Sequence, residues 1–152
     1  MSAKEYSRYL SSVQLYLFKR EGDKTFVLLQ LRKGGWGDNM WDASASGHID
    51  HGETPTEAAQ HEAVEEITVN VKTNDMKFIS VINKRVNEDE IYYNFSFYST
   101  QWTGTPNVNE PEKLYEIKWF DVKKLPKNMI ADRKIAIKNY LNKISYGEIK
   151  EY

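Results

Sequence analysis

The chain has 152 residues, 40% of them hydrophobic and 28% charged, which predicts one soluble globular domain over residues 1–152. Its formal net charge of −1 gives no electrostatic case for binding nucleic acid or a membrane surface, and the absence of cysteine excludes disulfides, thiolate metal sites and cysteine nucleophiles. No stretch has the apolar length of a signal peptide or of a membrane span, about 18 residues, so we expect a cytoplasmic protein.

The first fifty residues predict two strands, a loop and a short extended segment. Residues 11–20 alternate Val13, Leu15 and Leu17 with more polar neighbours, which is typical of a half-buried strand. Residues 25–32 form a denser apolar run that favours a buried strand. Glycines make residues 33–40 a loop, and residues 41–49 form a short extended segment.

A helix follows at Pro55. Thr54 is the expected N-cap, Pro55 takes the first helical position, and Glu57 completes a Thr-x-x-Glu capping box. An apolar stripe recurs every four residues along the helix at Ala59, Ala63 and Ile67.

The second half predicts three strands and a final helix. Residues 76–85 and 90–102 favour two strands joined by a polar turn, and residues 116–122 favour a third. Residues 131–144 predict an amphipathic helix whose apolar residues are Ile135, Ile137, Leu141 and Ile144. Strands and helices in this order indicate an α/β (α+β) domain in which helices pack on a mixed sheet.

The first helix carries an acidic cluster. Glu62, Glu65 and Glu66 stand at i, i+3 and i+4, so they share one face, and Glu53 precedes the helix on the Gly52 turn. Like charges at this spacing repel, and no Lys or Arg between residues 33 and 72 offsets them. Such a cluster is either a solvated surface or an all-oxygen site suited to Mg²⁺, Mn²⁺ or Ca²⁺.

The surrounding pattern favours the metal site, because residues 47–69 resemble the Nudix box of Nudix hydrolases. Gly47, Glu53, Glu62, Glu65 and Glu66 all stand at the family's spacing over 23 residues. The flanking segments 41–49 and 109–126 are also similar to family members, and the resemblance extends over about residues 10–145. It implies a Nudix-type α/β/α sandwich with a mixed β-sheet between helices.

The resemblance also implies an activity and its residues. Family members hydrolyse a diphosphate bond by water attack at phosphorus, and the resemblance implies a nucleoside triphosphate or nucleoside diphosphate derivative as substrate, with Mg²⁺ as cofactor and Mn²⁺ as the alternative. Glu62 and Glu66 are then the expected metal ligands, Glu65 a third ligand or the catalytic base, and Glu53 part of an outer shell. The backbone carbonyl near Gly47 is a further expected ligand.

Two positions depart from the family's pattern. His61 stands in place of an arginine that orients the acids; it can contact Glu53, but it has fewer donors and is charged only below about neutral pH. We therefore expect weak or pH-dependent activity. Thr68 stands in place of a glycine that ends the helix with positive φ, so we expect the helix to end differently here.

Outside the box, the candidate residues also have ordinary structural interpretations. Arg32, Lys33 and Arg85 could meet phosphates or simply end strands in solvent. The aromatic candidates for stacking on a base are Trp41 and, with it, Trp36, Tyr92 and Tyr93, although aromatic residues on strands more often belong to the core. The candidates for a distal acid are Glu110, Glu112 and Glu116, with Glu90 less favoured.

The expected partner is a small nucleotide or nucleoside diphosphate derivative, with no nucleic acid and no membrane, and a homodimer is possible. The alternative function is a nucleotide-binding or regulatory module with little or no turnover, which His61 and Thr68 favour and the intact acids oppose. Isomerase chemistry on the same fold normally uses a cysteine, which this chain lacks.

Overall fold

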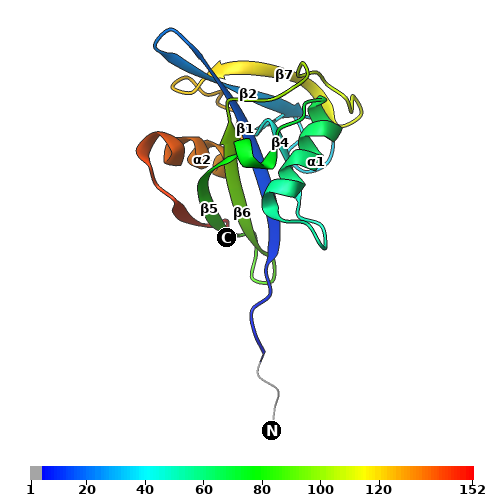
Figure 1. Ribbon diagram of the computed structural model, residues 1–152. Helices are drawn as coiled ribbons and strands as arrows, with labels where there is room; N and C mark the ends of the chain where they lie inside the picture. Colours follow the sequence, from blue (N-terminus) through cyan, green and yellow to red (C-terminus); the bar gives the residue numbers. More distant parts are fainter. Residues whose placement is uncertain (1–4) are drawn as a thin grey trace.

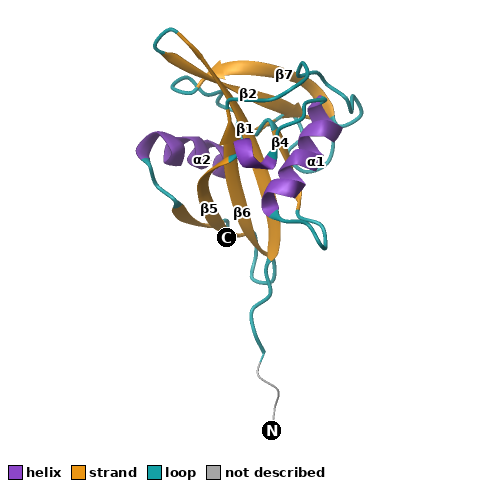
Figure 2. Cartoon of the chain, viewed as in Figure 1, coloured by secondary structure: helices purple, strands orange, loops and turns teal. Residues whose placement is uncertain are grey.

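The computed structural model describes residues 5–152, so the first four residues of the expected domain lie outside the described part. Two helices and eight strands follow one another in an order close to the expected one (Figures 1 and 2). The strands are β1 (Leu10–Glu21), β2 (Lys24–Arg32), β3 (Trp41–Asp42), β4 (Ala45–His48), β5 (Lys77–Arg85), β6 (Ile91–Ser99), β7 (Leu114–Asp121) and β8 (Tyr146–Lys150). The helices are α1 (Pro55–Ile67) and α2 (Ala131–Asn142), with a short 3₁₀ helix at Thr73–Asp75.

The sheet is mixed and is built around the long strand β1. Its strand order is β3-β2-β1-β6-β5-β8, with β4 also paired to β1 and β7 paired to β2. The pairs β1–β6 and β5–β8 are parallel, whereas the others are antiparallel. Helices α1 and α2 lie on opposite faces of the curled sheet (Figure 1). The expected mixed α+β fold is therefore confirmed.

Strand β1 separates two hydrophobic cores. Val13, Leu15 and Leu17 belong to a core that includes Ala59, Ala63 and Ile67 of α1. Tyr16 and Phe18 belong to a second core that includes Ala136 and Ile137 of α2. The prediction of a half-buried strand is wrong for this reason: both faces of β1 are covered, each by one helix.

Helix α1 begins as expected. The backbone N–H of Glu57 donates to Thr54 Oγ1 at 3.3 Å, and the N–H of Thr54 donates to Glu57 Oε1 at 3.2 Å, which completes the capping box. The apolar stripe at Ala59, Ala63 and Ile67 is buried.

The end of α1 corrects an expectation. Thr68 adopts the left-handed conformation, with φ 63° and ψ 24°, that a glycine would take at this position. Its hydroxyl lies within hydrogen-bonding distance of two carbonyl oxygens, that of Ile67 at 2.6 Å and that of Thr105 at 3.0 Å. These contacts anchor a residue that is otherwise strained at positive φ, so the helix keeps the usual end.

The C-terminal part also differs from the expectation. Helix α2 buries the polar residues Asp132, Arg133 and Asn139, while Leu141 and Ile144 are 42% and 47% exposed. The amphipathic pattern was misleading because the inner face of α2 meets a buried polar network as well as the core. Strand β8 was not expected, and it pairs with β5. Among the described residues, no helix is both long enough and apolar enough to cross a membrane.

Candidate functional site

A cavity of about 680 Å³ opens beside α1 and collects most of the expected site. Glu62, Glu65 and Glu66 of α1 line it together with Gly47 of β4 and Arg32 of β2. Neutral polar side chains of β1 and β6 also line it: Ser12, Gln14, Tyr92 and Asn94. The acids that the sequence placed on one helix face thus meet a common space.

Glu66 is the most buried acid of the cavity, with 9% of its surface exposed. The backbone N–H of Ser46 donates to Glu66 Oε1 at 2.8 Å, and Gln30 Nε2 lies 3.5 Å from Oε2. Burial raises the pKa of this carboxyl well above its usual value. Strands β2 and β4 therefore fix the position of the Glu66 carboxylate.

Glu62 lies directly against the backbone of Gly47. A Cβ atom at residue 47 would lie 2.4 Å from Glu62 Oε1, so only glycine allows this close approach. Burial, followed by the charge of Glu65, raises the pKa of Glu62 to about 7. The glycine at this position thus makes room for a carboxylate rather than for an unusual backbone conformation.

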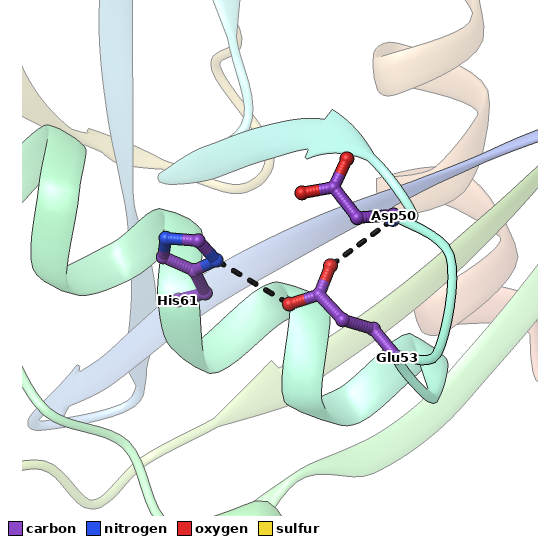
Figure 3. Close-up of side chains that lie close together, drawn as sticks. All are labelled: Asp50, Glu53 and His61. Atoms are coloured by element: carbon purple, nitrogen blue, oxygen red, sulfur yellow. Dashed lines mark hydrogen bonds and ion pairs between the residues drawn. The ribbon is translucent and has the colours of Figure 1, made fainter.

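His61 contacts two of the box acids, Glu53 and Glu65. Its Nδ1 lies 3.3 Å from Glu53 Oε2 and its Nε2 lies 2.7 Å from Glu65 Oε1. Glu53 in turn accepts a hydrogen bond of 3.0 Å from the N–H of Asp50, and Figure 3 shows the side chains of Asp50 and Glu53, from the loop before α1, close to His61 on the helix. The bonds to Glu65 and then Glu53 raise the pKa of His61. Glu53 and His61 lie outside the cavity lining, so they act on it through Glu65.

The acids fit a hard divalent cation. Glu62, Glu65 and Glu66 offer oxygen atoms only, which is the donor chemistry that Mg²⁺ and Mn²⁺ prefer. In the described part of the chain, no Lys or Arg forms an ion pair with any of the three. A cation held between Glu62 and Glu66 would offset charge that the protein itself leaves uncompensated.

A buried ionic network lies next to these acids. Asp42 accepts hydrogen bonds from Arg133 Nε at 2.8 Å, from Arg32 at 3.0 Å and from Ser46 Oγ at 2.8 Å. Burial opposes the charge of Asp42, but attraction by Arg133 and Arg32 prevails and lowers its pKa. Because Ser46 also binds Glu66, the network and the acidic cluster are directly connected.

Not all expected substrate contacts lie at the cavity. Lys33 and Arg85 are not among its lining residues; the Arg85 guanidinium donates to the Tyr152 hydroxyl at 3.4 Å. Trp41 is 6% exposed and packs edge-on against Phe120, so it has no free face for a ligand. Trp36, by contrast, is 55% exposed and lines the cavity.

The candidate distal acids differ in whether they line the cavity. Glu110 lines the cavity and pairs with Lys113 at 3.3 Å, whereas Glu112 and Glu116 are exposed and do not line it. Glu90, the less favoured candidate, is a lining residue as well. Of the three favoured candidates, Glu110 is thus the one that lines the cavity, and its charge acts on Glu62.

Several lining residues were missed by reasoning from the sequence. Lys84, Lys113 and Arg133 all line the cavity. Lys84 is the second-last residue of β5 and Arg133 lies on a helix with several other cations, so neither has a local signal that separates it from surface residues. Gln30, which contacts Glu66 without lining the cavity, does carry a local signal, because it is a polar residue within an apolar strand.

Comparison with known proteins gives a consistent result. The family model of the NUDIX domain matches residues 8–140. An uncharacterized Nudix hydrolase of Clostridium acetobutylicum is 36% identical over 76 residues, which is 49% of this chain and 36% of that protein's length. The matched part thus spans about a third of this relative.

Solved structures show the same fold at low identity. The MutT NUDIX hydrolase of Burkholderia pseudomallei superimposes with a TM-score of 0.75 at 20% identity, covering 88% of this chain and 98% of that one. The NUDIX domain of Shewanella oneidensis NrtR, solved in complex with ADP-ribose, gives 0.72 at 14% identity, covering 92% and 91%. With the family model matching most of its length and three of the four box acids, Glu62, Glu65 and Glu66, gathered at one cavity, the chain belongs to the Nudix family.

Proposed function

We propose that the protein is a Mg²⁺-dependent pyrophosphohydrolase that cleaves a diphosphate bond in a nucleoside triphosphate or a nucleoside diphosphate derivative. The observation that carries the proposal is the cavity in which Glu62, Glu65 and Glu66 lie together with Arg32 and Lys113. A diphosphate held through a divalent cation needs both oxygen ligands for the metal and cationic side chains for its outer oxygens.

The roles follow from the positions of the carboxylates. Glu62 and Glu66 hold the cation, because Glu62 is half-buried, Glu66 is buried, and neither forms an ion pair with a cation among the described residues. When bound, the cation offsets the charge of the phosphates and lowers the pKa of a bound water. The carbonyl of Gly47, beside Glu62, is a further candidate ligand; Mn²⁺ suits the same donor set.

The proton of the attacking water needs an acceptor. Glu65 is half-exposed, lines the cavity and is oriented by His61, so it is the base in this proposal. Glu110 is the distal acid that assists from the same cavity. Arg32 contacts the phosphates from the end of β2, and Trp36 offers an exposed ring to a base.

A second candidate function is a nucleotide-binding module with little turnover. It is favoured by the 2.7 Å contact between His61 Nε2 and Glu65 Oε1, because a base engaged by an imidazole is less available to a water. The NUDIX domain of NrtR, which was solved with ADP-ribose, shows that the fold can hold such a ligand. Turnover distinguishes the two functions.

The test is release of phosphate and diphosphate from a panel of nucleoside triphosphates, nucleotide sugars, ADP-ribose and dinucleoside polyphosphates, with Mg²⁺, with Mn²⁺ and with a chelator. Glu66→Gln should lower kcat at least about 100-fold on the best substrate, because it removes a charged ligand. Its melting temperature should not fall, since burial already disfavours the charged form of Glu66.

Glu112→Gln is the matched control, because it makes the same change at an exposed acid that does not line the cavity, and its activity should equal that of the wild type. Near-normal turnover by Glu66→Gln would contradict the proposed metal site. Nucleotide binding without turnover by the wild type would favour the binding module.

A further inference from the structure

Three cationic side chains lie close to one indole ring at the cavity. The ring centroid of Trp36 lies 5.1 Å from the Arg32 guanidinium, 5.1 Å from Lys84 Nζ and 5.6 Å from the Arg133 guanidinium. The Lys84 and Arg133 side chains are only 5% and 8% exposed. Charges this deeply buried are costly unless they are paired with opposite charges. Which carboxylates pair with these three cations therefore determines whether the group can bind a further anion.

Two buried carboxylates supply most of the counter-charge. Asp42 binds Arg32 and Arg133, as described above. Asp132 of α2 accepts from Lys84 Nζ at 2.9 Å and also pairs with Arg133. The Asp42 and Asp132 side chains are 0% and 3% exposed. Two carboxylates thus face three cations, which leaves one positive charge to be balanced.

The remaining carboxylate comes from the C-terminal segment. Glu151 Oε1 lies 3.2 Å from Lys84 Nζ, and the Glu151 side chain is 41% exposed. The backbone N–H of Glu151 donates to the carbonyl of Arg85 at 2.9 Å, which holds the residue beside Lys84 after β8 ends. Among the described residues, Glu151 is the one exposed acid that pairs with this group of cations.

This pair differs in kind from the buried ones. Ion pairs with an exposed partner contribute little and are screened by salt, so an oxyanion arriving from the cavity can compete with Glu151. The Lys84 ammonium also has three N–H donors, of which Asp132 and Glu151 take two. Ser46 connects the cations to the metal-site acids, because it binds both Asp42 and Glu66.

We propose that Lys84, beneath Trp36, is the centre of an anion subsite that takes a phosphate oxyanion of the substrate beyond the pair held at the acids, and that Glu151 competes with it as an internal counter-ion. The inference rests on the proposed function for the identity of the substrate, but not for the existence of the subsite. Such a subsite favours substrates with a chain of three or more phosphates over substrates in which the diphosphate is attached to a neutral group.

The experiment measures binding of inorganic phosphate to the full chain by calorimetry at low salt with a chelator present. Glu151→Gln should bind phosphate about three- to fivefold more tightly than the wild type, which is the size expected for removing a half-exposed competing charge. The gain should shrink as salt is added. Lys84→Gln should weaken binding at least about fivefold, with its melting temperature measured alongside.

Glu148→Gln is the matched control: it removes the same charge from β8, where Glu148 contacts Tyr146 and not Lys84. Its affinity should equal that of the wild type. Equal affinities of the wild type, Glu148→Gln and Glu151→Gln, or no measurable binding by any of them, would overturn the subsite. The binding experiment does not depend on turnover. If Glu151→Gln bound phosphate more tightly but the wild type hydrolysed none of the substrates, the subsite would stand and the proposed function would be rejected.

Discussion

His61 places a titratable group where the family pattern has a permanently charged one. Its two ring nitrogens face Glu53 and Glu65, and only the protonated imidazole can donate to both. An arginine would keep these contacts at any physiological pH. The single residue therefore couples the orientation of the proposed base to pH.

His61→Arg should extend the activity of the protein to higher pH. The pKa of His61 is raised above 6.5 by Glu65 and Glu53, so the bridge is complete below pH 6.5 and is lost as pH rises through the raised value. In the wild type, kcat/KM should fall over that range relative to the arginine variant. The measurement is the pH profile of kcat/KM with Mg²⁺ on the best substrate.

His61→Gln is the control, because glutamine carries no charge at any pH. Its kcat/KM should therefore not show the fall that the wild type shows over this pH range. If the wild type and His61→Arg gave superimposable profiles, His61 would have no orienting role.

At the scale of elements, the packing of α1 against β4 sets the position of Glu62. The two elements approach so closely at Gly47 that the space of a Cβ atom is already filled by the Glu62 carboxyl group. The same strand donates the Ser46 N–H to Glu66. Strand β4 thus positions two of the three carboxylates, one by steric contact and one by a hydrogen bond.

Gly47→Ala should lower activity far more than stability. The added methyl group would lie 2.4 Å from Glu62 Oε1, and this flexible side chain can move away, taking a proposed ligand out of place. We expect at least about a tenfold loss of kcat/KM, partly restored by raised Mg²⁺, with a small change in melting temperature. Steady-state kinetics over a range of Mg²⁺ concentrations tests it.

Gly147→Ala serves as the control, because its nearest neighbour is Ile82 Cγ1 at 3.8 Å, an ordinary contact. Unchanged kinetics in Gly47→Ala would show that the position of the Glu62 carboxylate does not matter for turnover.

At the scale of the whole molecule, one buried ionic network connects elements from distant parts of the chain. The network consists of four residues beside the cavity: Asp42 of β3, Lys84 of β5, and Asp132 and Arg133 of α2. The network therefore bears on stability and on the proposed anion subsite at once. The pKa values of Asp42 and Asp132 are both lowered, because attraction by the adjacent cations outweighs the burial that opposes ionisation.

Asp42→Asn should destabilise the fold by about 3–5 kcal/mol at neutral pH, because it leaves Arg133 buried with one charged partner fewer. Since the folded-state pKa of Asp42 is lowered from 3.8, its stabilising contribution is present above pH 3.8 and is lost as pH falls through the lowered value. The difference between wild type and variant should shrink accordingly in acid. Urea unfolding at several pH values measures it.

Asp23→Asn, in the exposed turn between β1 and β2, is the control and should change stability by less than about 0.5 kcal/mol. A similarly small effect of Asp42→Asn would mean that the network contributes little to stability.

The sequence by itself determined the features that depend only on residues close together in the chain. The capping box of Thr54 and Glu57 fixed where α1 begins, because capping depends on residues three positions apart. The spacing of Glu62, Glu65 and Glu66 placed three carboxylates on one helix face, whatever the helix packs against. Most strands were located as well, because their apolar runs are continuous in the chain.

The tertiary structure decided which distant residues join those acids. It places Glu110 and Trp36 at the cavity and Glu112 and Trp41 away from it, and it brings Lys84 and Arg133 to the same cavity. The sequence could not show this, because a side chain's environment depends on the elements that pack around it. Strand β8 and the contact of Glu151 with Lys84 depend likewise on pairing with a strand some sixty residues earlier, which no local pattern encodes.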